Sequence, residues 1–327
     1  MSLVNVAIHS SQYPEKVQAD LRNSLRLRQI NHKFHYDSYK QTQHWLELHQ
    51  ACSPTRTDPN CEACYDAAFA AATKACRTAS VHLIGLGCGG GQKDTRLLRL
   101  LKPTRSRLSY TPVDVSTAMV LVAHQTASQI ISEPHPLVCD LMGVEDLASL
   151  FAGRPQADAA RLVTFFGMMP NFEPQMILPK LAGLLRPGDW LLLSANLAPG
   201  DDYAAGLRQV LPQYDNALTK DWLMLFLFDL GVERTDGTLE WQIEPCPSGD
   251  DLQRLTASFR FDHPRSLRVA GEKFDFAAGQ KIRLFFSYRY TPQRVVSHLR
   301  QYGLTVQEQW ITNTGEEGLF LVRAAAG

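Results

Sequence analysis

Short apolar segments alternate with helical segments through the middle of the chain. Residues 81–86 are mostly apolar and run into a cluster of glycines, and similar segments occur at 107–113, 136–139, 161–166 and 189–194. Helical patterns stand between them, at 94–101, 118–128 and 144–151. Strands that alternate with helices at this spacing predict a parallel sheet with helices on both faces, an α/β fold.

The alternation stops near residue 200. A helical stretch follows, and strand-like segments then occur at 239–243, 254–261 and 281–290. Glycine and proline separate these segments, so we interpret the region as an α+β insertion. The earlier pattern resumes with a helix at 292–302 and two paired strands at 304–312 and 318–322, which complete the sheet. The first 80 residues lack the period of a strand and predict helices.

Composition and charge narrow the possible partners. The chain has 327 residues, and its 33 Lys and Arg balance its 33 Asp and Glu. A neutral chain argues against a nucleic acid or an anionic membrane as the partner, because both select basic surfaces. The longest apolar run, residues 222–228, is far shorter than the ~20 residues of a membrane span. With no signal peptide visible at the N-terminus, we expect a soluble, cytoplasmic protein.

Seven cysteines, an odd number in a large chain, fit a reducing compartment. Four of them gather at Cys52, Cys61, Cys64 and Cys76, and Cys61-Glu-Ala-Cys64 resembles half of a zinc site. No second Cys-x-x-Cys follows, and on the helix expected at 61–72 the two cysteines share a face as small core residues would. We therefore favour structural cysteines, and because the histidines also lack ligand spacing we predict no metal.

The glycine cluster and two aspartates mark one edge of the predicted sheet. In an open parallel sheet the ligand binds at the carboxyl ends of the strands, where residues 85–91 (Gly-Leu-Gly-Cys-Gly-Gly-Gly) would expose backbone N–H groups. Asp114 ends the second strand and could accept hydrogen bonds from both ribose hydroxyls of a nucleoside. Asp140 ends the third strand and could accept one from the adenine amine.

Each of these features has an ordinary structural explanation. Glycine-rich turns occur without ligands, and a strand-end aspartate is often a helix cap or a turn residue. Together they favour an adenosine-bearing ligand. Gly85, Gly87 and Gly90 loosely satisfy the dinucleotide spacing, which leaves NAD open. The paired strands at the C-terminus favour S-adenosylmethionine (SAM) instead, because a dinucleotide fold repeats its parallel half.

Several short motifs extend from residue 33 through the insertion. They are Lys-Phe-His-Tyr-Asp at 33–37, Pro-Thr-Arg at 54–56, Leu-Gly-Cys-Gly-Gly-Gly-Gln-Lys at 86–93, Thr-Pro-Val-Asp-Val-Ser at 111–116, Phe-Gly-Met-Met-Pro-Asn at 166–171, Leu-Ala-Gly-Leu-Leu-Arg-Pro-Gly-Asp at 181–189 and Phe-Ala-Ala-Gly at 276–279. In these motifs the chain resembles the histidine-specific methyltransferases of ergothioneine biosynthesis and their relatives, as a divergent member.

The resemblance implies a class I methyltransferase with a Rossmann-like sheet and SAM as cofactor. It implies two domains: an accessory substrate-binding domain of residues 1–60 plus 200–290, and a SAM-binding domain of residues 61–199 plus 291–327. The residues expected to hold SAM are Gly87, Gly89, Lys93, Asp114, Asp140 and Leu141. One departure is Gly85, where the family usually carries an acidic residue.

The substrate positions match the family only in part. By resemblance, Tyr36, Asn171 and Tyr214 hold the α-carboxylate and α-amino group of an amino acid. The alternative is that the two tyrosines are half-buried structural residues and that the asparagine belongs to a turn. Where the histidine enzymes carry a Tyr before Pro-Thr-Arg, this chain has Ser53. Where they carry a Glu two residues before a Ser, it has Phe285 before Ser287.

The loss of that carboxylate removes the reason to select histidine. Strand alternation predicts that Arg283, Phe285, Ser287 and Arg289 share one face. We therefore expect a SAM-dependent N-methyltransferase for the amino group of an amino acid or related small amine other than histidine. No catalytic base is expected, because alignment and desolvation of a neutral amine supply much of the rate.

Three alternatives stay open at this point. Phe285 could be a core residue with the true pocket elsewhere. The chain could be a catalytically inactive SAM-binding protein that acts as a sensor or partner subunit, or a nicotinamide oxidoreductase. For Arg56 in the Pro-Thr-Arg motif we expect a structural ion pair rather than a catalytic contact.

Overall fold

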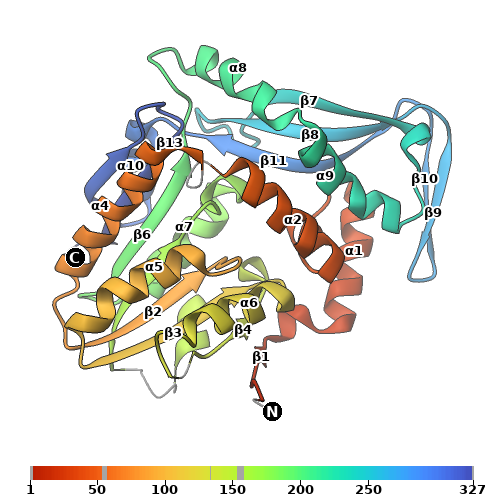
Figure 1. Cartoon of the computed structure of the whole chain (residues 1–327). Helices are drawn as coiled ribbons and strands as arrows, with labels where there is room; N and C mark the ends of the chain where they lie inside the picture. Colours follow the sequence, from red (N-terminus) through yellow and green to blue (C-terminus); the bar gives the residue numbers. More distant parts are fainter. Residues whose placement is uncertain (1–2, 54–56, 133, 153–157, 326–327) are drawn as a thin grey trace.

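A computed structural model describes residues 3–53, 57–132, 134–152 and 158–325 (Figure 1). Its centre is an eight-stranded sheet in the order β1-β4-β3-β2-β5-β6-β13-β12. The strands are β1 Ala7–Ile8, β2 Ser80–Leu86, β3 Arg107–Asp114, β4 Leu137–Val138, β5 Ala160–Phe165, β6 Trp190–Asn196, β12 Leu304–Ile311 and β13 Glu317–Ala324. The first six strands in this order pair in parallel, and β13 is antiparallel to both β6 and β12. The predicted α/β sheet closed by a C-terminal strand pair is confirmed.

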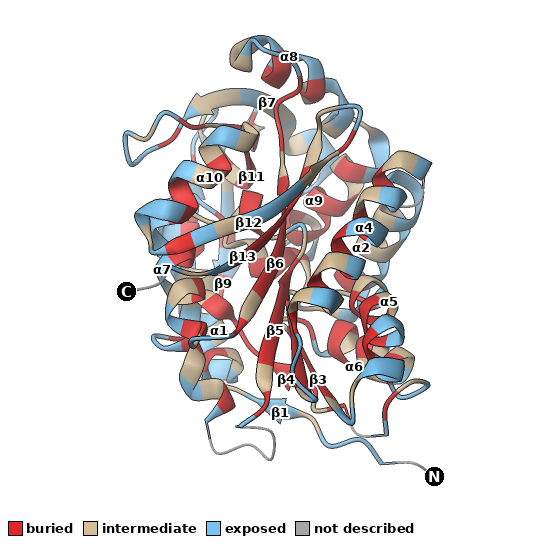
Figure 2. Ribbon diagram, turned by 90° about the vertical axis from the view of Figure 1, so that its left-hand side faces the viewer, coloured by how far each residue is buried: buried red, intermediate tan, exposed pale blue. Residues whose placement is uncertain are grey.

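Helices cover both faces of this sheet, which explains why its central strands β2, β5 and β6 are mostly apolar and buried. One face packs against α4 Pro59–Ala75, α5 Gln92–Leu101 and α6 Thr117–Ala127, and the other against α7 Pro174–Leu184 and α10 Pro292–Gln301. Figure 2 shows the buried strands as a layer between the two sets of helices. The parallel register places the ends of β2, β3 and β5 at one edge, where the loops that follow them meet.

The region after β6 forms the predicted α+β insertion. It contains α8 Tyr203–Tyr214, α9 Ala217–Asp229, an antiparallel sheet of β7 Gly237–Pro245, β8 Gln253–Phe261 and β11 Lys281–Arg289, and a hairpin of β9 Arg265–Val269 and β10 Glu272–Phe276. The N-terminal helices α1 Pro14–Leu27 and α2 Tyr39–Cys52 pack on it, and Leu25 and Phe34 share a core with Trp222 and Phe285. The domain boundaries given above stay a prediction.

Two local expectations were wrong, and one element was missed. Residues 144–151 form no α-helix; only a 3-10 helix, η5 Leu147–Phe151, occurs there, with Asp146 as its cap. The N-terminal region is not purely helical, because β1 pairs in parallel with β4. The β9–β10 hairpin was not anticipated at all. Pairing with the distant β4, rather than local pattern, determines a strand as short as β1.

A β-bulge in β11 changes which side chains share a face. The register against β8 shifts between Arg283 and Phe285, so Leu284 is the extra residue. Arg283 therefore packs over the ring of Phe286, with its guanidinium carbon 5.2 Å from the ring centre, and not beside Phe285. The predicted grouping of Arg283 with Phe285, Ser287 and Arg289 is wrong for Arg283. Simple alternation cannot anticipate a bulge, because the extra residue reverses the pattern after it.

Candidate functional site

The glycine loop connects β2 to α5 at the edge where the strand ends meet. Gly87 has a φ of +62°, and a Cβ at this position would lie 2.6 Å from the Sδ of Met168, so only glycine fits. Gly89 donates its N–H to the Oδ2 of Asp114 at 3.0 Å. The loop thus bonds Asp114 at the end of β3 and lies against Met168, which follows β5. The family resemblance did not predict the contact with Met168.

Asp94 supplies a buried carboxylate beneath this loop. A Cβ at Gly85 would overlap its Oδ2, so the space that a side chain at position 85 would use belongs to Asp94. The carboxylate accepts hydrogen bonds from the Tyr110 hydroxyl (2.6 Å) and the Thr164 hydroxyl (2.7 Å). Burial raises the pKa of Asp94, while these two bonds oppose the shift. An acidic group from α5 therefore lies next to Gly85.

Asp114 follows β3 with both carboxylate oxygens anchored to backbone. Oδ2 accepts from Gly89, and Oδ1 accepts from the Ser116 N–H at 3.0 Å. The N-cap of α6 is Ser116 rather than Asp114, so the capping explanation for this aspartate does not hold. Burial raises the pKa of Asp114, and the backbone bonds oppose the rise. Each oxygen retains a lone pair that a ribose hydroxyl could use.

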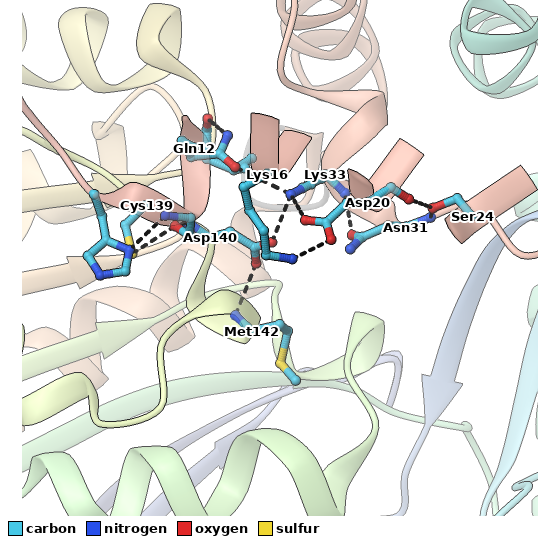
Figure 3. Close-up of polar contacts among 12 residues, drawn as sticks. Gln12, Lys16, Asp20, Ser24, Asn31, Lys33, Cys139, Asp140 and Met142 are labelled. Atoms are coloured by element: carbon cyan, nitrogen blue, oxygen red, sulfur yellow. Dashed lines mark hydrogen bonds and ion pairs between the residues drawn. The ribbon is translucent and has the colours of Figure 1, made fainter. Parts of the chain in front are cut away.

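Asp140 is held by the N-terminal part of the chain (Figure 3). Its Oδ1 accepts the Met142 N–H at 3.0 Å, and its Oδ2 lies 3.2 Å from the Nζ of Lys33. Lys33 is buried and also pairs with Asp20 at 2.7 Å. Asp140 is thus the N-cap of a 3-10 helix, η4 Leu141–Gly143, as well as half of an ion pair. Leu141 follows it and is buried in the sheet core.

Lys93 lies in the first turn of α5 and points toward α4. Its Nζ donates to the hydroxyl of Tyr65 at 2.7 Å and lies 4.3 Å from the centre of that ring. Tyr65 in turn donates to the Oε1 of Glu317 at 2.5 Å. Burial lowers the pKa of Lys93, and the nearby Glu317 opposes this. The ammonium therefore sits beside the glycine loop with donor capacity to spare for a ligand carboxylate.

A second group of polar side chains forms where the insertion meets the sheet. We call Asn196, Tyr214, Ser287 and Arg289 the polar cluster. The Tyr214 oxygen lies 2.8 Å from the Nη2 of Arg289, 3.1 Å from the Ser287 oxygen and 3.5 Å from the Nδ2 of Asn196. The structure thus brings together Tyr214 and Ser287, two of the residues expected to contact substrate.

Phe285 lies beside the polar cluster in an aromatic environment. Its ring centre is 6.0 Å from that of Tyr214, 6.1 Å from Trp222, 6.3 Å from Trp241 and 5.2 Å from His32. Three of these neighbours, Trp222, Trp241 and His32, were not singled out from the sequence. No local signal marks them, because they come from separate elements.

Aromatic contacts continue from Phe285 to the glycine loop. Trp222 contacts Tyr36 at 5.5 Å between ring centres, and Tyr36 contacts Trp45 at 6.0 Å. Trp45 in turn lies 3.3 Å from the position that a Cβ of Gly89 would occupy. Burial raises the pKa of Tyr36, and the charge of Asp114 adds to the rise. Tyr36 therefore stands between the expected substrate residues and the expected cofactor residues.

Two further expected substrate residues have other contacts. Asn171 donates its Nδ2 to the Phe286 carbonyl at 2.8 Å, which ties the loop after β5 to the insertion. Ser53 is buried at the C-cap of α2, where its N–H bonds the His49 carbonyl. The Pro-Thr-Arg motif with Arg56 lies outside the described residues, so the expected ion pair of Arg56 stays a prediction, as does the place of Ser53 in a substrate site.

The sequence profile described as "Histidine-specific methyltransferase, SAM-dependent" matches residues 15–205 and 245–324. The chain belongs to this family. The predictions of the family, of SAM as its cofactor and of the methyltransferase class are confirmed. The residues present also fit SAM, since Asp114 and Lys93 offer the acceptor and donor groups that its ribose and carboxylate need.

Two curated relatives of this methyltransferase are about equally similar to it. The N-methyltransferase imqF of Aspergillus flavus is 27% identical over 255 residues, which span 73% of this chain and 66% of imqF. The histidine N-alpha-methyltransferase of Mycolicibacterium smegmatis is 27% identical over 257 residues, 73% of this chain and 74% of the relative. A solved structure, the 1,6-didemethyltoxoflavin-N1-methyltransferase of Burkholderia thailandensis, is 12% identical with a TM-score of 0.44, covering 96% of this chain and 91% of that one.

The remaining chemistry-bearing residues have structural contacts. Cys61 lies 3.5 Å from Glu317, Cys64 lies 3.7 Å from the Ile311 carbonyl, and Cys76 is the buried C-cap of α4. Within the described ranges, no three His, Cys, Asp or Glu side chains are arranged to hold a metal ion. The same ranges contain no helix long and apolar enough to cross a membrane.

Proposed function

We propose that this methyltransferase transfers a methyl group from SAM to the amino group of an amino acid or related small amine other than histidine. The observation that carries the proposal is the environment of Phe285. At the position where histidine enzymes carry a carboxylate, this chain has a phenylalanine among Tyr214, Trp222 and Trp241. A ring or branched apolar side chain suits such neighbours, while an imidazole would leave its N–H groups unpaired.

The roles proposed here come from the family resemblance, together with the contacts described above. Gly87, Gly89, Lys93, Asp114, Asp140 and Leu141 hold the cofactor, and Tyr36, Ser53, Asn171, Tyr214, Phe285 and Ser287 hold the substrate. When bound, SAM supplies a methyl group on a positively charged sulfur. The ammonium form of the substrate would lose its proton to water before the site closes, so that the neutral nitrogen is the group that would accept the methyl. The protein orients the neutral amine and excludes water, and none of its side chains is needed as a base.

Two names among the relatives support transfer to nitrogen. One relative is named as an N-methyltransferase and the other as a histidine N-alpha-methyltransferase. The alternative, an inactive SAM-binding sensor or partner subunit, rests on the departures at Gly85, Ser53 and Phe285. The carboxylate of Asp94 beneath the loop weakens the argument from Gly85, because it returns an acidic group to the region. A neutral surface and a cytoplasmic location remain part of the proposal, with a small molecule rather than nucleic acid as the partner.

A thermal-shift screen followed by a methyl-transfer assay tests the proposal. S-adenosylhomocysteine (SAH) should raise the melting temperature, and one or more non-histidine amino acids or biogenic amines should raise it further. The same compound should then accept a labelled methyl group from SAM. Synergy with histidine alone would overturn the interpretation of Phe285. Stabilisation by SAH without transfer to any of these acceptors would favour the sensor.

A further inference from the structure

Arg289 is a buried cation without a described counter-ion. Its side chain is 5% exposed, and no Asp or Glu among the described residues forms an ion pair with it. The Nη1 atom donates to the carbonyls of Leu197 (2.9 Å) and Glu316 (3.3 Å), while Nε has no partner. A buried charge is costly unless it is paired, so an unpaired one calls for an explanation.

The neighbouring strand shows the ordinary arrangement. Arg254, also buried, lies 2.9 Å from Glu173 and 3.5 Å from Glu244. Glu316 is an acidic residue in contact with Arg289. Its carboxylate, however, accepts two hydrogen bonds from Gln213, both at 3.0 Å. The part of Glu316 that accepts a hydrogen bond from Arg289 is its backbone carbonyl. Among the described residues, Arg289 therefore has neutral acceptors but no carboxylate to balance its charge.

Among the described residues, Tyr214 is the one whose side chain accepts a hydrogen bond from Arg289. The Nη2 of Arg289 donates to the Tyr214 oxygen at 2.8 Å, and the guanidinium carbon lies 5.3 Å from the ring centre. Because the Tyr214 oxygen accepts this bond and one from Asn196, its own proton is directed at the Ser287 oxygen 3.1 Å away, and the Ser287 hydroxyl proton is then free to be donated. A donor polarised by a cation behind it binds an anion more strongly than a neutral donor does. Asn196 also donates to the Ser287 oxygen at 3.4 Å, so the Ser287 hydroxyl is the open donor of the polar cluster.

We propose that Arg289, acting through Tyr214, is the positioning residue that supplies the counter-charge for a carboxylate on the substrate. This inference rests on the proposed function and narrows it: the acceptor is an amino acid that retains its carboxylate, and the corresponding decarboxylated amine binds poorly. Phe285 lies next to the same tyrosine. One small molecule could therefore place its carboxylate at the polar cluster and its side chain against Phe285.

Matched acid and amine pairs test the inference. L-phenylalanine with phenethylamine, L-tyrosine with tyramine, and L-tryptophan with tryptamine are titrated into the SAH complex by calorimetry. In the wild-type protein at least one acid should bind about tenfold or more tightly than its amine. Arg289→Met should remove most of this difference by weakening the acid and not the amine, and Arg289→Lys should retain part of it. SAH affinity should stay within about twofold in both variants.

Arg283→Met is the control, because Arg283 lies on the same strand but packs over Phe286. It should leave the ratio between acid and amine unchanged. If Arg289→Met folds, binds SAH and keeps the full preference for the acid, the inference is wrong and the proposed function stands. Binding of none of the acids, together with no methyl transfer to any amino acid, would overturn both.

Discussion

The Nζ of Lys33 lies 3.2 Å from Oδ2 of Asp140 and 2.7 Å from Oδ2 of Asp20. One buried ammonium thus stands between two carboxylates, one from α1 and one from the end of β4. Burial would raise the pKa of Asp20, but hydrogen bonds from Lys16 and Lys33 outweigh it and the pKa is lowered. The N-terminal region is in this way tied to the edge of the sheet where SAM is expected to bind.

Removal of this ammonium should destabilise the fold and weaken cofactor binding. Lys33→Met leaves Asp20 and Asp140 without their common partner, and we expect a loss of about 3 kcal/mol in the free energy of unfolding. Affinity for SAH should fall, since Asp140 is no longer held in place. Urea unfolding with and without SAH measures both effects.

Lys40→Met is the matched control for this prediction. Lys40 pairs with Asp229 at 2.9 Å, but both side chains are largely exposed, at 53% and 43%. Its loss should cost less than about 1 kcal/mol. Equal effects of the two substitutions would contradict a special role for Lys33.

Asp37 should make stability depend on pH between about 4 and 6. Burial raises its pKa to about 6 from an ordinary value of 3.8, although Lys33 and two backbone bonds oppose the shift. The folded state therefore binds the proton more tightly than the unfolded state, so the contribution is favourable below pH 3.8 and is lost as the pH rises through 6. Asp37→Asn should gain about 2 kcal/mol at pH 8 and little at pH 4.

Denaturant titrations at pH 4, 6 and 8 would show this trend. Asp201→Asn, at an exposed position, is the control and should not change the profile. A gain for Asp37→Asn that is the same at all three pH values would show that the carboxyl group does not titrate as described.

Gly85 and Asp94 should be energetically coupled. Gly85→Ala places a methyl group onto the Asp94 carboxylate, and we expect a loss of about 2–3 kcal/mol. Asp94→Ala alone leaves the hydroxyls of Tyr110 and Thr164 without their acceptor, at a cost of about 1–3 kcal/mol. The double variant should be more stable than the sum predicts, because the added methyl group then has room. Strict additivity in this double-mutant cycle would contradict the contact.

Phe285→Glu should change which amino acids bind. The new carboxylate would face the rings of Tyr214 and Trp222, at the position where the histidine enzymes carry an acid. In the SAH complex, affinity for aromatic amino acids should fall about tenfold, and histidine should begin to bind. Phe285→Leu keeps the site apolar and should produce no response to histidine. If neither variant alters amino-acid preference, Phe285 is a core residue.

Much of the sheet could be predicted because its strands are buried on both faces and read as continuous apolar runs. Gly87 and Asp114 could be placed at the edge of the sheet from their positions after β2 and β3. By contrast, the ion pair between Lys33 and Asp140 joins residues 107 positions apart, and no pattern in the sequence around either residue predicts it. The bulge at Leu284 is equally hidden, since a regular strand and a bulged one have the same composition.

Neither the aromatic contacts from Phe285 to Gly89 nor the unpaired charge of Arg289 follows from a spacing rule. Trp45, Trp222 and Trp241 come from α2, α9 and β7, and only the folded chain brings them near Tyr36 and Phe285. The family resemblance predicted Tyr214 and Ser287 as substrate residues, but it did not predict that Arg289 donates a hydrogen bond to Tyr214.

The residue after β11, Tyr290, connects the sheet of the insertion to the segment that ends β6. Strand β11 pairs with β8 inside the insertion, and at its end the Tyr290 N–H bonds the Asn196 carbonyl at 2.9 Å while the Ala198 N–H bonds the Tyr290 carbonyl at 2.8 Å. The polar cluster stands at this junction, with Tyr214 from one side and Asn196 from the other. A shift of the insertion against the large sheet would therefore change the distance between Tyr214 and Asn196. We expect substitutions in the distant β9–β10 hairpin that cause such a shift to alter KM, although, among the described residues, the hairpin does not contact the polar cluster.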